Sequence, residues 1–304
     1  MLGIFVMLGL LSSLSTTVGQ LLELDIQYRV LRGYSPRILY TFDIGTNKLQ
    51  AVVDTGSPDF FVWKDWYVIP IFPYAFIESV VGEGGCKYLP SGCYTCPEPC
   101  FPHVEYVTRF ADGSTFVIFP QKDTIRFGEI EVPNLSFGLI YGQTPPPTEV
   151  KPINLLGLGI YKDADFNLFL HELLKSRRIR SLTFAIYLST ADGHKGKLVL
   201  GGGDPRVYKH PLRYVKFNSR RHYEITLSSM QGGGGYLTIG INQHLLLDTG
   251  DASSRVPQIY FDDLIASIAQ QTPEVGGRRI SYTWNNKSGL IEFPCEYHSL
   301  LPPI

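Results

Sequence analysis

The sequence predicts a mostly β protein, and three features of its 304 residues indicate this class. Its 30 glycines and 21 prolines divide the chain into short segments. Aromatic residues make up 13% of the chain and stand with Val and Ile in short runs between those turn residues. Helical patterning is confined to two short segments, 163–179 and 260–271. The clearest strands are expected at 37–44, 114–120, 182–189 and 196–202.

Length and charge limit the function classes. The chain is long enough for one large domain or two lobes, and its 44% hydrophobic content indicates a globular protein. It carries 27 basic and 28 acidic residues, a formal net charge of -1. Such a balance offers no attraction for nucleic acid or an anionic membrane, so neither is expected as a partner.

The sequence begins with an apolar stretch followed by small residues. Residues 1–19 resemble a signal peptide with cleavage near Gly19, although they lack the usual basic start. The alternative is a short N-terminal anchor. We expect the chain to enter the secretory pathway.

An Asp-Thr-Gly triplet occurs twice. Residues 49–53 form a short apolar strand that ends on Asp54, Thr55, Gly56 and Ser57, and residues 244–247 lead in the same way to Asp248, Thr249 and Gly250. One such triplet is a weak signal, but two copies in the same setting suggest an internal duplication in which each half supplies one carboxylate. Glycine lets the backbone turn, so the two loops are expected to meet closely.

Two carboxylates brought within hydrogen-bonding distance cannot both stay ionised, because like charges in a shared site raise one pKa. The pair then holds one proton, and its titration belongs to both groups together. Such a pair offers a base and an acid at once, which suits activation of a water molecule against a carbonyl group.

Four of the five cysteines crowd into a Pro/Gly-rich insert at 82–103. They are Cys86, Cys93, Cys96 and Cys100, whereas Cys295 stands near the end of the sequence. In a secreted chain two local disulfides are favoured, and a four-thiolate zinc site is the alternative. Two Asn-x-Ser patterns, at Asn134 and Asn286, are possible glycosylation sites.

Further motifs follow in a consistent order along the chain, and with them the sequence resembles the pepsin-like aspartic proteases from about Tyr28 to Ile304. Residues 109–116 are similar to the flap hairpin of that family. Residues 153–162 contain an apolar-apolar-Gly segment, Leu155-Leu156-Gly157, similar to the one that passes beneath the first aspartate. Residues 196–208 and 222–230 look like the strands that link the lobes and enter the second lobe.

The resemblance implies a role for each motif, in a protein that needs no metal or cofactor, acts on protein or peptide substrates and is a monomer. Asp54 and Asp248 would be the catalytic dyad, supported by Thr55, Ser57 and Thr249, with Ser57 hydrogen-bonded to Asp54. Gly56, Phe110, Gly113 and Gly250 would contact the substrate. The structural alternative is that Asp, Gly and Ser at these positions only form turns.

Four departures from the family pattern are visible. Phe110 stands where the flap usually has Tyr, so the ring is kept and the hydroxyl lost. Asp251 and Ala252 replace the usual Thr and Ser, although Ser253 could compensate. Little room precedes Tyr28 for an inhibitory prosegment. The family pattern also has a second apolar-apolar-Gly segment and a cysteine that pairs with the position of Cys295. Both are expected in a stretch that the sequence up to Ile304 does not include.

These observations predict a bilobal pepsin-like fold with an N-lobe at 28–190, which the Cys-rich insert decorates, and an incomplete C-lobe at 191–304. The cleft between the lobes would be crossed by the flap. The expected function is that of an aspartic endopeptidase acting at acid pH, outside the cell or in an acidic vacuole. The alternative is a catalytically inactive secreted binding protein on the same fold, and a third interpretation, ranked first, is an active enzyme represented by an incomplete sequence.

Overall fold

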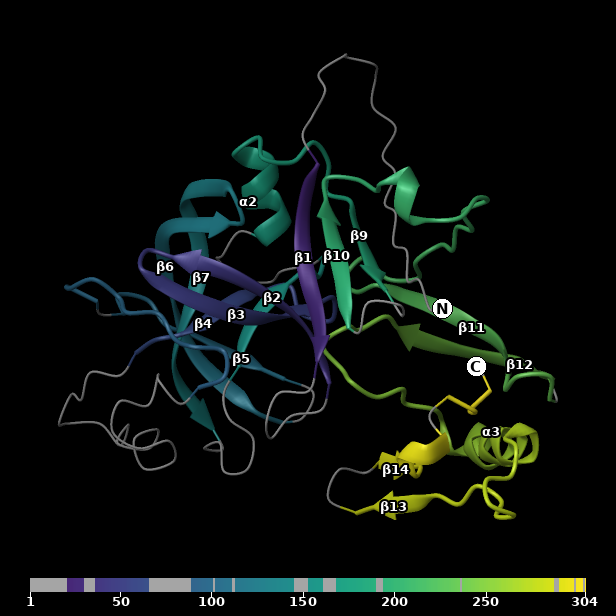
Figure 1. Ribbon diagram of the computed structural model, residues 1–304. Coiled ribbons are helices and arrows are strands. Elements are labelled where there is room, and N and C mark those ends of the chain that lie inside the picture. Colours follow the sequence, from purple (N-terminus) through teal and green to yellow (C-terminus); the bar gives the residue numbers. More distant parts are fainter. Residues whose placement is uncertain are drawn as a thin grey trace. The chain divides into compact units, whose positions relative to one another are not determined.

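The computed structural model describes residues 21–29, 36–65, 89–100, 102–110, 113–144, 153–160, 168–189, 194–235, 237–286, 290–297, 299–302 and 304. The expected signal peptide and Cys86 lie outside these residues. The structure is mostly β, as the sequence predicts (Figure 1). The chain divides into two compact units. Unit 1 holds the described residues up to Tyr223 together with Leu247–Ala252, and unit 2 holds Glu224–Leu246 with the described residues from Ser253 onward.

Unit 1 is built on one ten-stranded sheet with the order β5-β6-β7-β4-β8-β3-β2-β1-β10-β9. Most neighbours are antiparallel, but β8 runs parallel to β3, and β4 runs parallel to β7. The predicted strands at 37–44, 114–120, 182–189 and 196–202 correspond to β2, the start of β6, β9 and most of β10. The strands are β1 Leu22–Arg29, β2 Arg37–Ile44, β3 Asn47–Asp54, β4 Phe60–Trp63, β5 Tyr106–Arg109, β6 Thr115–Phe127, β7 Ile130–Thr144, β8 Asn154–Gly157, β9 Phe184–Leu188 and β10 Lys195–Leu200.

The core of unit 1 contains a group of packed aromatic rings. Phe60 packs edge-to-face against Phe42 and Phe169, with ring centroids 5.5 and 5.6 Å apart. Phe169 begins α2 (Phe169–Lys175), which lies against β7 (Figure 1). The described helix is shorter than the predicted segment 163–179, of which 163–167 lie outside the described residues. It ends at Lys175 because Arg177 adopts a left-handed backbone, with φ 57°.

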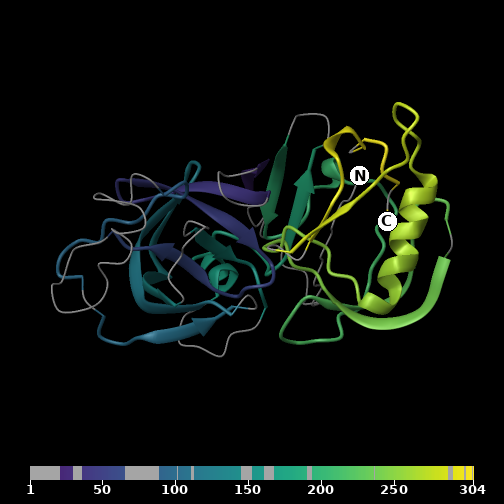
Figure 2. The same ribbon diagram turned by 90° about the horizontal axis from the view of Figure 1, so that it is seen from below.

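Unit 2 is smaller. β11 (Glu224–Gln231) and β12 (Leu237–Leu246) form an antiparallel pair, and β13 (Thr283–Asn285) pairs with β14 (Leu290–Glu292). The predicted helix at 260–271 is present as α3 (Gln258–Gln271), the yellow-green helix of Figure 2. Its buried Leu264, Ile265 and Ile268 form the small core of the unit. Among the described residues, no helix has the length and apolar character needed to span a membrane.

The described part of the Cys-rich insert, 89–100 and 102–103, does more than decorate the surface. Tyr94 is 1% exposed in the core, and its hydroxyl donates to Asp123 at 2.6 Å. Its backbone N–H donates to Trp63 at 2.7 Å, and its carbonyl accepts from Asp65 at 2.9 Å. The insert therefore extends the end of β4 and contributes to the packing of unit 1.

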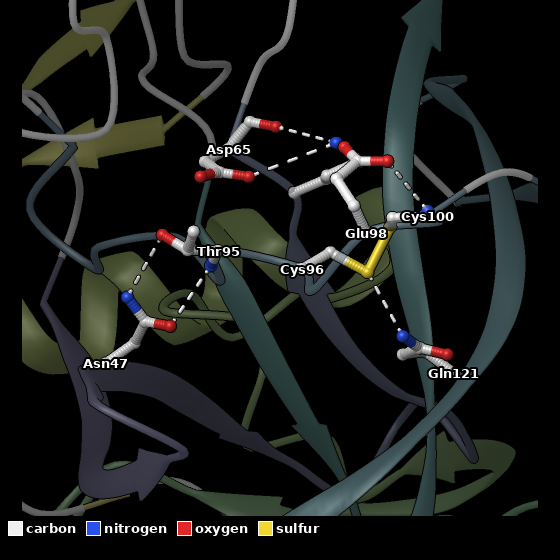
Figure 3. A network of polar contacts seen from close by, with 8 residues as sticks. Asn47, Asp65, Thr95, Cys96, Glu98, Cys100 and Gln121 are labelled. Atoms are coloured by element: carbon white, nitrogen blue, oxygen red, sulfur yellow. Dashed lines mark hydrogen bonds and ion pairs between the residues drawn. A yellow bond between two sulfur atoms is a disulfide. The ribbon is translucent and has the colours of Figure 1, made fainter.

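Cysteine pairing in the insert follows the disulfide prediction. Cys96 and Cys100 form a buried disulfide, and Gln121 donates to the Cys96 sulfur at 3.0 Å (Figure 3). Cys93 is also disulfide-bonded. Because Cys96 and Cys100 are joined to each other, they are not available as thiolates for the zinc site considered as the alternative.

Candidate active site

The first Asp-Thr-Gly loop begins where β3 leaves the core. Ala51 and Val53 are fully buried, and this apolar run carries Asp54 to the end of the strand. The backbone N–H groups of Gly56 and Ser57 both donate to Asp54 Oδ1, at 2.7 and 3.2 Å. The expected contact of Ser57 with Asp54 is thus made by its backbone, while its hydroxyl accepts from Asp59 N–H at 3.4 Å. The loop holds one carboxylate oxygen in a fixed direction.

The second loop repeats this arrangement within the same unit. Leu247 N–H donates to the carbonyl of Tyr223 at 2.9 Å, which anchors the chain just before Asp248. Gly250 N–H then donates to Asp248 Oδ1 at 2.8 Å, as Gly56 does for Asp54. The duplication seen in the sequence is therefore also a duplication of local geometry.

The two loops are joined by four hydrogen bonds arranged with approximate two-fold symmetry. Thr55 N–H donates to the Thr249 hydroxyl at 3.1 Å, and Thr249 N–H donates to the Thr55 hydroxyl at 3.0 Å. Each hydroxyl donates its own proton across to the other loop, Thr55 to Leu247 O and Thr249 to Val53 O, both at 2.7 Å. Each hydroxyl thus donates one hydrogen bond to the opposite loop and accepts one from it.

The glycines face the opposite aspartate. A Cβ added at Gly250 would lie 2.5 Å from Asp54 Cγ, and a Cβ added at Gly56 would lie 2.6 Å from Asp248 Oδ1. Real Cβ atoms are not found at such distances, so both positions require glycine for the carboxyl groups to meet. The sequence prediction that glycine permits close approach thus has a definite geometric basis.

Electrostatics follows from this proximity. Asp54 is 7% exposed, and its burial, the charge of Asp248 and a hydrogen bond with the Asp248 carboxyl raise its pKa to about 7. The N–H groups of Gly56 and Ser57 partly oppose this rise in pKa, because they stabilise the ionised form. The result is a carboxyl that keeps its proton beside another carboxyl, as expected for a pair that shares one proton.

The segment 153–160 passes under the first loop. Leu158 N–H donates to Asp54 O at 2.7 Å, and Gly159 N–H donates to Ser57 O at 2.9 Å. A Cβ at Gly157 would lie 2.6 Å from Ser57 O, so the close approach requires glycine here as well. The apolar-apolar-Gly segment fixes the loop from below.

Two supporting residues could not be identified from the sequence. Tyr223 is fully buried, and its hydroxyl donates to Leu158 O at 2.7 Å while its carbonyl accepts from Leu247 N–H. It therefore connects the segment under Asp54 to the strand that leads to Asp248. Asn154, also fully buried, accepts from Trp63 N–H at 2.8 Å and donates to Gln50 O at 3.0 Å. No sequence pattern marks either side chain, because their partners are backbone groups far along the chain.

The predicted flap forms the turn between β5 and β6. Phe110 N–H donates to Ser114 O at 2.8 Å, and Gly113, with φ 87°, donates to Phe110 O at 3.0 Å. Residues 111–112 lie outside the described part of the chain. The Phe110 ring packs edge-to-face on Phe116, whose ring packs on Trp63, with centroids 5.1 and 5.9 Å apart. These contacts connect the turn to β4, the strand that follows the Asp54 loop.

The remaining predicted feature is Asp251, which is half-buried directly after Gly250, followed by exposed Ala252. Within the part of the chain that the structure describes, no group of three or more His, Cys, Asp or Glu side chains could hold a metal ion. The chemistry available at the paired loops is that of two adjacent carboxyl groups.

Comparison with known proteins gives a consistent family. Residues 39–302 match the family described as eukaryotic aspartyl protease. Secreted aspartic protease 10 of Candida albicans is 23% identical over 278 residues, covering 86% of this chain and 56% of that protein. Secreted aspartic protease 5 of Candida albicans is 23% identical, covering 86% of this chain and 62% of that protein. Candidapepsin-1 of Candida albicans is 27% identical, covering 82% of this chain and 62% of that protein. The chain thus spans between 56% and 62% of the length of these relatives.

Proposed function

Because the chain belongs to the eukaryotic aspartyl protease family, we propose that it is an aspartic endopeptidase that hydrolyses peptide bonds in proteins at acid pH. The observation that carries this proposal is the pairing of Asp54 and Asp248 across two interlocked loops. The secreted relatives support a further part of the proposal, that the chain acts outside the cell or in an acidic compartment of the secretory pathway.

In the proposed mechanism the two carboxyl groups share one proton and hold a water molecule between them. The ionised carboxylate takes a proton from this water as its oxygen attacks the carbonyl carbon of the peptide bond, and the protonated carboxyl donates to the carbonyl oxygen. The resulting tetrahedral intermediate collapses when the nitrogen of the peptide bond receives a proton from the pair and the C–N bond breaks. One hydroxyl of the intermediate returns its proton to the pair as the carboxyl product forms, so the pair regains its one shared proton. No covalent bond to the protein forms, and no metal takes part.

The supporting groups have roles in this scheme. The N–H groups of Gly56 and Ser57 fix the first carboxylate, and Gly250 N–H fixes the second, so little rearrangement is needed during the reaction. Gly56 and Gly250 also let the two carboxyl groups meet, because a Cβ at either position would overlap the opposite aspartate. Both glycines would contact the substrate backbone. The turn containing Phe110 and Gly113 would close over the substrate and exclude solvent.

The proposal is tested by incubating the full chain with a denatured protein at acid pH and following cleavage, with and without pepstatin. We expect pepstatin-sensitive cleavage that is lost in Asp54→Asn and in Asp248→Asn, each of which keeps the size of the side chain. Asp25→Asn is the matched control, because Asp25 is 85% exposed and pairs with Lys197 at the surface.

The outcomes separate the alternatives. Cleavage retained in either dyad variant contradicts the mechanism. A folded wild-type chain that binds a peptide but never cleaves it supports the alternative of a catalytically inactive binding protein. Circular dichroism of each variant establishes that a loss of cleavage is not a loss of folding.

A further inference from the structure

One motif of the sequence, Asn134-Leu135-Ser136, plays no part in the dyad and lies in an irregular part of β7. In the pairing of β6 with β7, Asp123 faces Leu135 and Ile125 faces Val132, with a shift of register between them. Pro133 and Asn134 therefore stand opposite a single residue of β6. This is a β-bulge, with one extra residue on β7.

The bulge sets the direction of the side chains around it. Val132 and Leu135 are each 1% exposed, although residues three apart in a regular strand point to opposite faces. The extra residue restores the inward direction of Leu135, and it leaves Pro133 and Asn134 as two consecutive exposed positions. Asn134 has φ 55°, a left-handed conformation that Asn adopts more readily than most residues. Its amide group is thus presented to solvent on the outer side of the sheet.

We propose that Asn134 is an N-glycosylation site. The pattern Asn-x-Ser with x other than Pro is the acceptor for this modification, and the exposed bulge gives an attached oligosaccharide room outside the sheet. The proposal rests on the proposed entry into the secretory pathway and not on the proposed catalysis. The second pattern, at Asn286, includes residues outside the described part of the chain and is not part of the proposal.

The reaction needs an oligosaccharide donor carried on a polyisoprenyl pyrophosphate. The Asn134 amide nitrogen attacks the anomeric carbon of the first sugar, so a C–N bond forms while the C–O bond to the pyrophosphate breaks. The amide loses one proton to a base of the transferase, and the lipid pyrophosphate leaves. The net change is transfer of the oligosaccharide, without oxidation or reduction.

The structure also fixes when this transfer occurs. Leu135 and Ser136 are 1% and 8% exposed once β7 has paired, so a transferase cannot bind the acceptor segment in the folded chain. The oligosaccharide is therefore added before β6 and β7 come together. After folding, Asn134 is the one exposed residue of the acceptor pattern 134–136, so the attached sugar does not disturb the buried Leu135 and Ser136.

A simpler explanation is that Asn134 is present only because its backbone is left-handed. Aspartate tolerates that conformation in the same way but has no amide to modify. Ser136 has no role in the left-handed turn, whereas the acceptor pattern requires a hydroxyl at that position. Variants at the two positions therefore separate the two explanations.

The test is translation of the full chain in the presence of microsomes, in an Asn286→Gln background and with Asp54→Asn to prevent self-cleavage. Electrophoresis before and after an N-glycosidase shows whether one glycan is attached. We expect a band shift that the glycosidase removes, absent in Asn134→Asp and Ser136→Ala, and retained in Ser136→Thr, which preserves the hydroxyl. Detergent-permeabilised microsomes added after translation and folding, which give the folded chain access to the transferase, are expected to give no shift. Circular dichroism of the unmodified Asn134→Asp chain checks that the bulge variant folds.

Three results would overturn the proposal. The first is a chain that is protected from added protease inside the microsomes yet carries no glycan. The second is a chain that never enters them, since its Asn134 then never meets the donor. The third is a shift that persists in Asn134→Asp. Because cleavage activity is removed in the background, none of these results depends on the proposed peptidase function.

Discussion

At the scale of single residues, the site depends on two positions where no side chain fits. A methyl group at Gly56 or Gly250 would overlap the opposite carboxyl group and force Asp54 and Asp248 apart. Since a displacement of about 1 Å in a reacting group can cost on the order of 100-fold in rate, we expect Gly56→Ala and Gly250→Ala each to reduce cleavage at least that much.

Steady-state cleavage of a denatured protein by each glycine variant measures this effect. Gly203→Ala is the control, because the nearest atom to a Cβ there is 3.8 Å away, on Tyr208, an ordinary contact. An active Gly250→Ala chain would show that the carboxyl groups need not meet as closely as the structure places them.

A separate prediction concerns the energetic coupling between Thr55 and Thr249. Thr55→Val removes the hydroxyl to which Thr249 N–H donates and which donates to Leu247 O. Thr249→Val removes the hydroxyl to which Thr55 N–H donates and which donates to Val53 O. Each variant is expected to lower the free energy of unfolding by about 1–3 kcal/mol or more. The double variant should cost less than the sum, by about 0.5–3 kcal/mol, because the two hydroxyls act as one connected set.

Urea unfolding of the wild type, the two single variants and the double variant provides a double-mutant cycle. Strictly additive losses would mean that the four bonds act independently. Thr249→Ser keeps the hydroxyl and is expected to retain most of the stability.

At the scale of the elements, Tyr223 joins two segments that belong to different loops. Tyr223→Phe keeps the ring contacts with Phe184 and Phe217 and removes only the bond to Leu158 O. A buried carbonyl is then left without its partner, so we expect a loss of about 1–3 kcal/mol in the free energy of unfolding. Because Leu158 N–H holds Asp54 O, kcat is expected to fall while KM stays nearly unchanged.

Steady-state kinetics and urea unfolding of this variant together check the positioning role. Tyr214→Phe provides the comparison, since Tyr214 is 70% exposed in the same unit. An equal fall in kcat for both variants, or a change in KM alone, would contradict the assignment of Tyr223 to the support of the dyad.

At the scale of the whole molecule, the raised pKa of Asp54 makes stability depend on pH. The folded state binds this proton more tightly than the unfolded chain, in which an aspartate has a pKa of about 3.9. The associated stability is fully present below about pH 4 and is lost as pH rises toward and through about 7. The total change is on the order of a few kcal/mol, which removal of the carboxyl should abolish.

The measurement is the free energy of unfolding of wild type and of Asp54→Asn at several pH values between about 4 and 8. The difference between the two proteins separates the coupled pair of Asp54 and Asp248 from the other titrating groups. We expect Asp54→Asn to be the more stable protein at neutral pH, with the advantage shrinking in acid. A constant difference across this range would show that Asp54 has an ordinary pKa.

The parts of this molecule that the sequence predicts are those with a repeating local signal. Short runs of Val, Ile and aromatic residues between turn residues located β2, the start of β6, β9 and most of β10. Two Asp-Thr-Gly triplets at the ends of apolar strands located both carboxylates. The local signal also predicted disulfides in the insert, of which Cys96–Cys100 is one. The role of each site residue in catalysis stays a prediction, which the aspartate, glycine and Tyr223 variants test.

Other features depend on contacts that no local pattern encodes. Tyr223 and Asn154 bond to backbone groups on distant strands, and the insert was expected to decorate unit 1 although Tyr94 lies in its core. The left-handed backbone at Arg177 ended α2 earlier than its periodicity predicts. For Tyr223, Asn154 and Tyr94 the deciding interaction is tertiary, so it becomes visible only when the chain is folded.

The bonds between Thr55 and Thr249 join residues 194 positions apart. Neither loop has its full set of partners until the other is present, so a growing polypeptide on the ribosome carries the first aspartate alone until the second loop has been made. The carboxyl pair arises only after residue 250 has emerged and the long intervening segment has folded back. A cell that makes this protein therefore meets the paired carboxyl groups only after both loops have been synthesised.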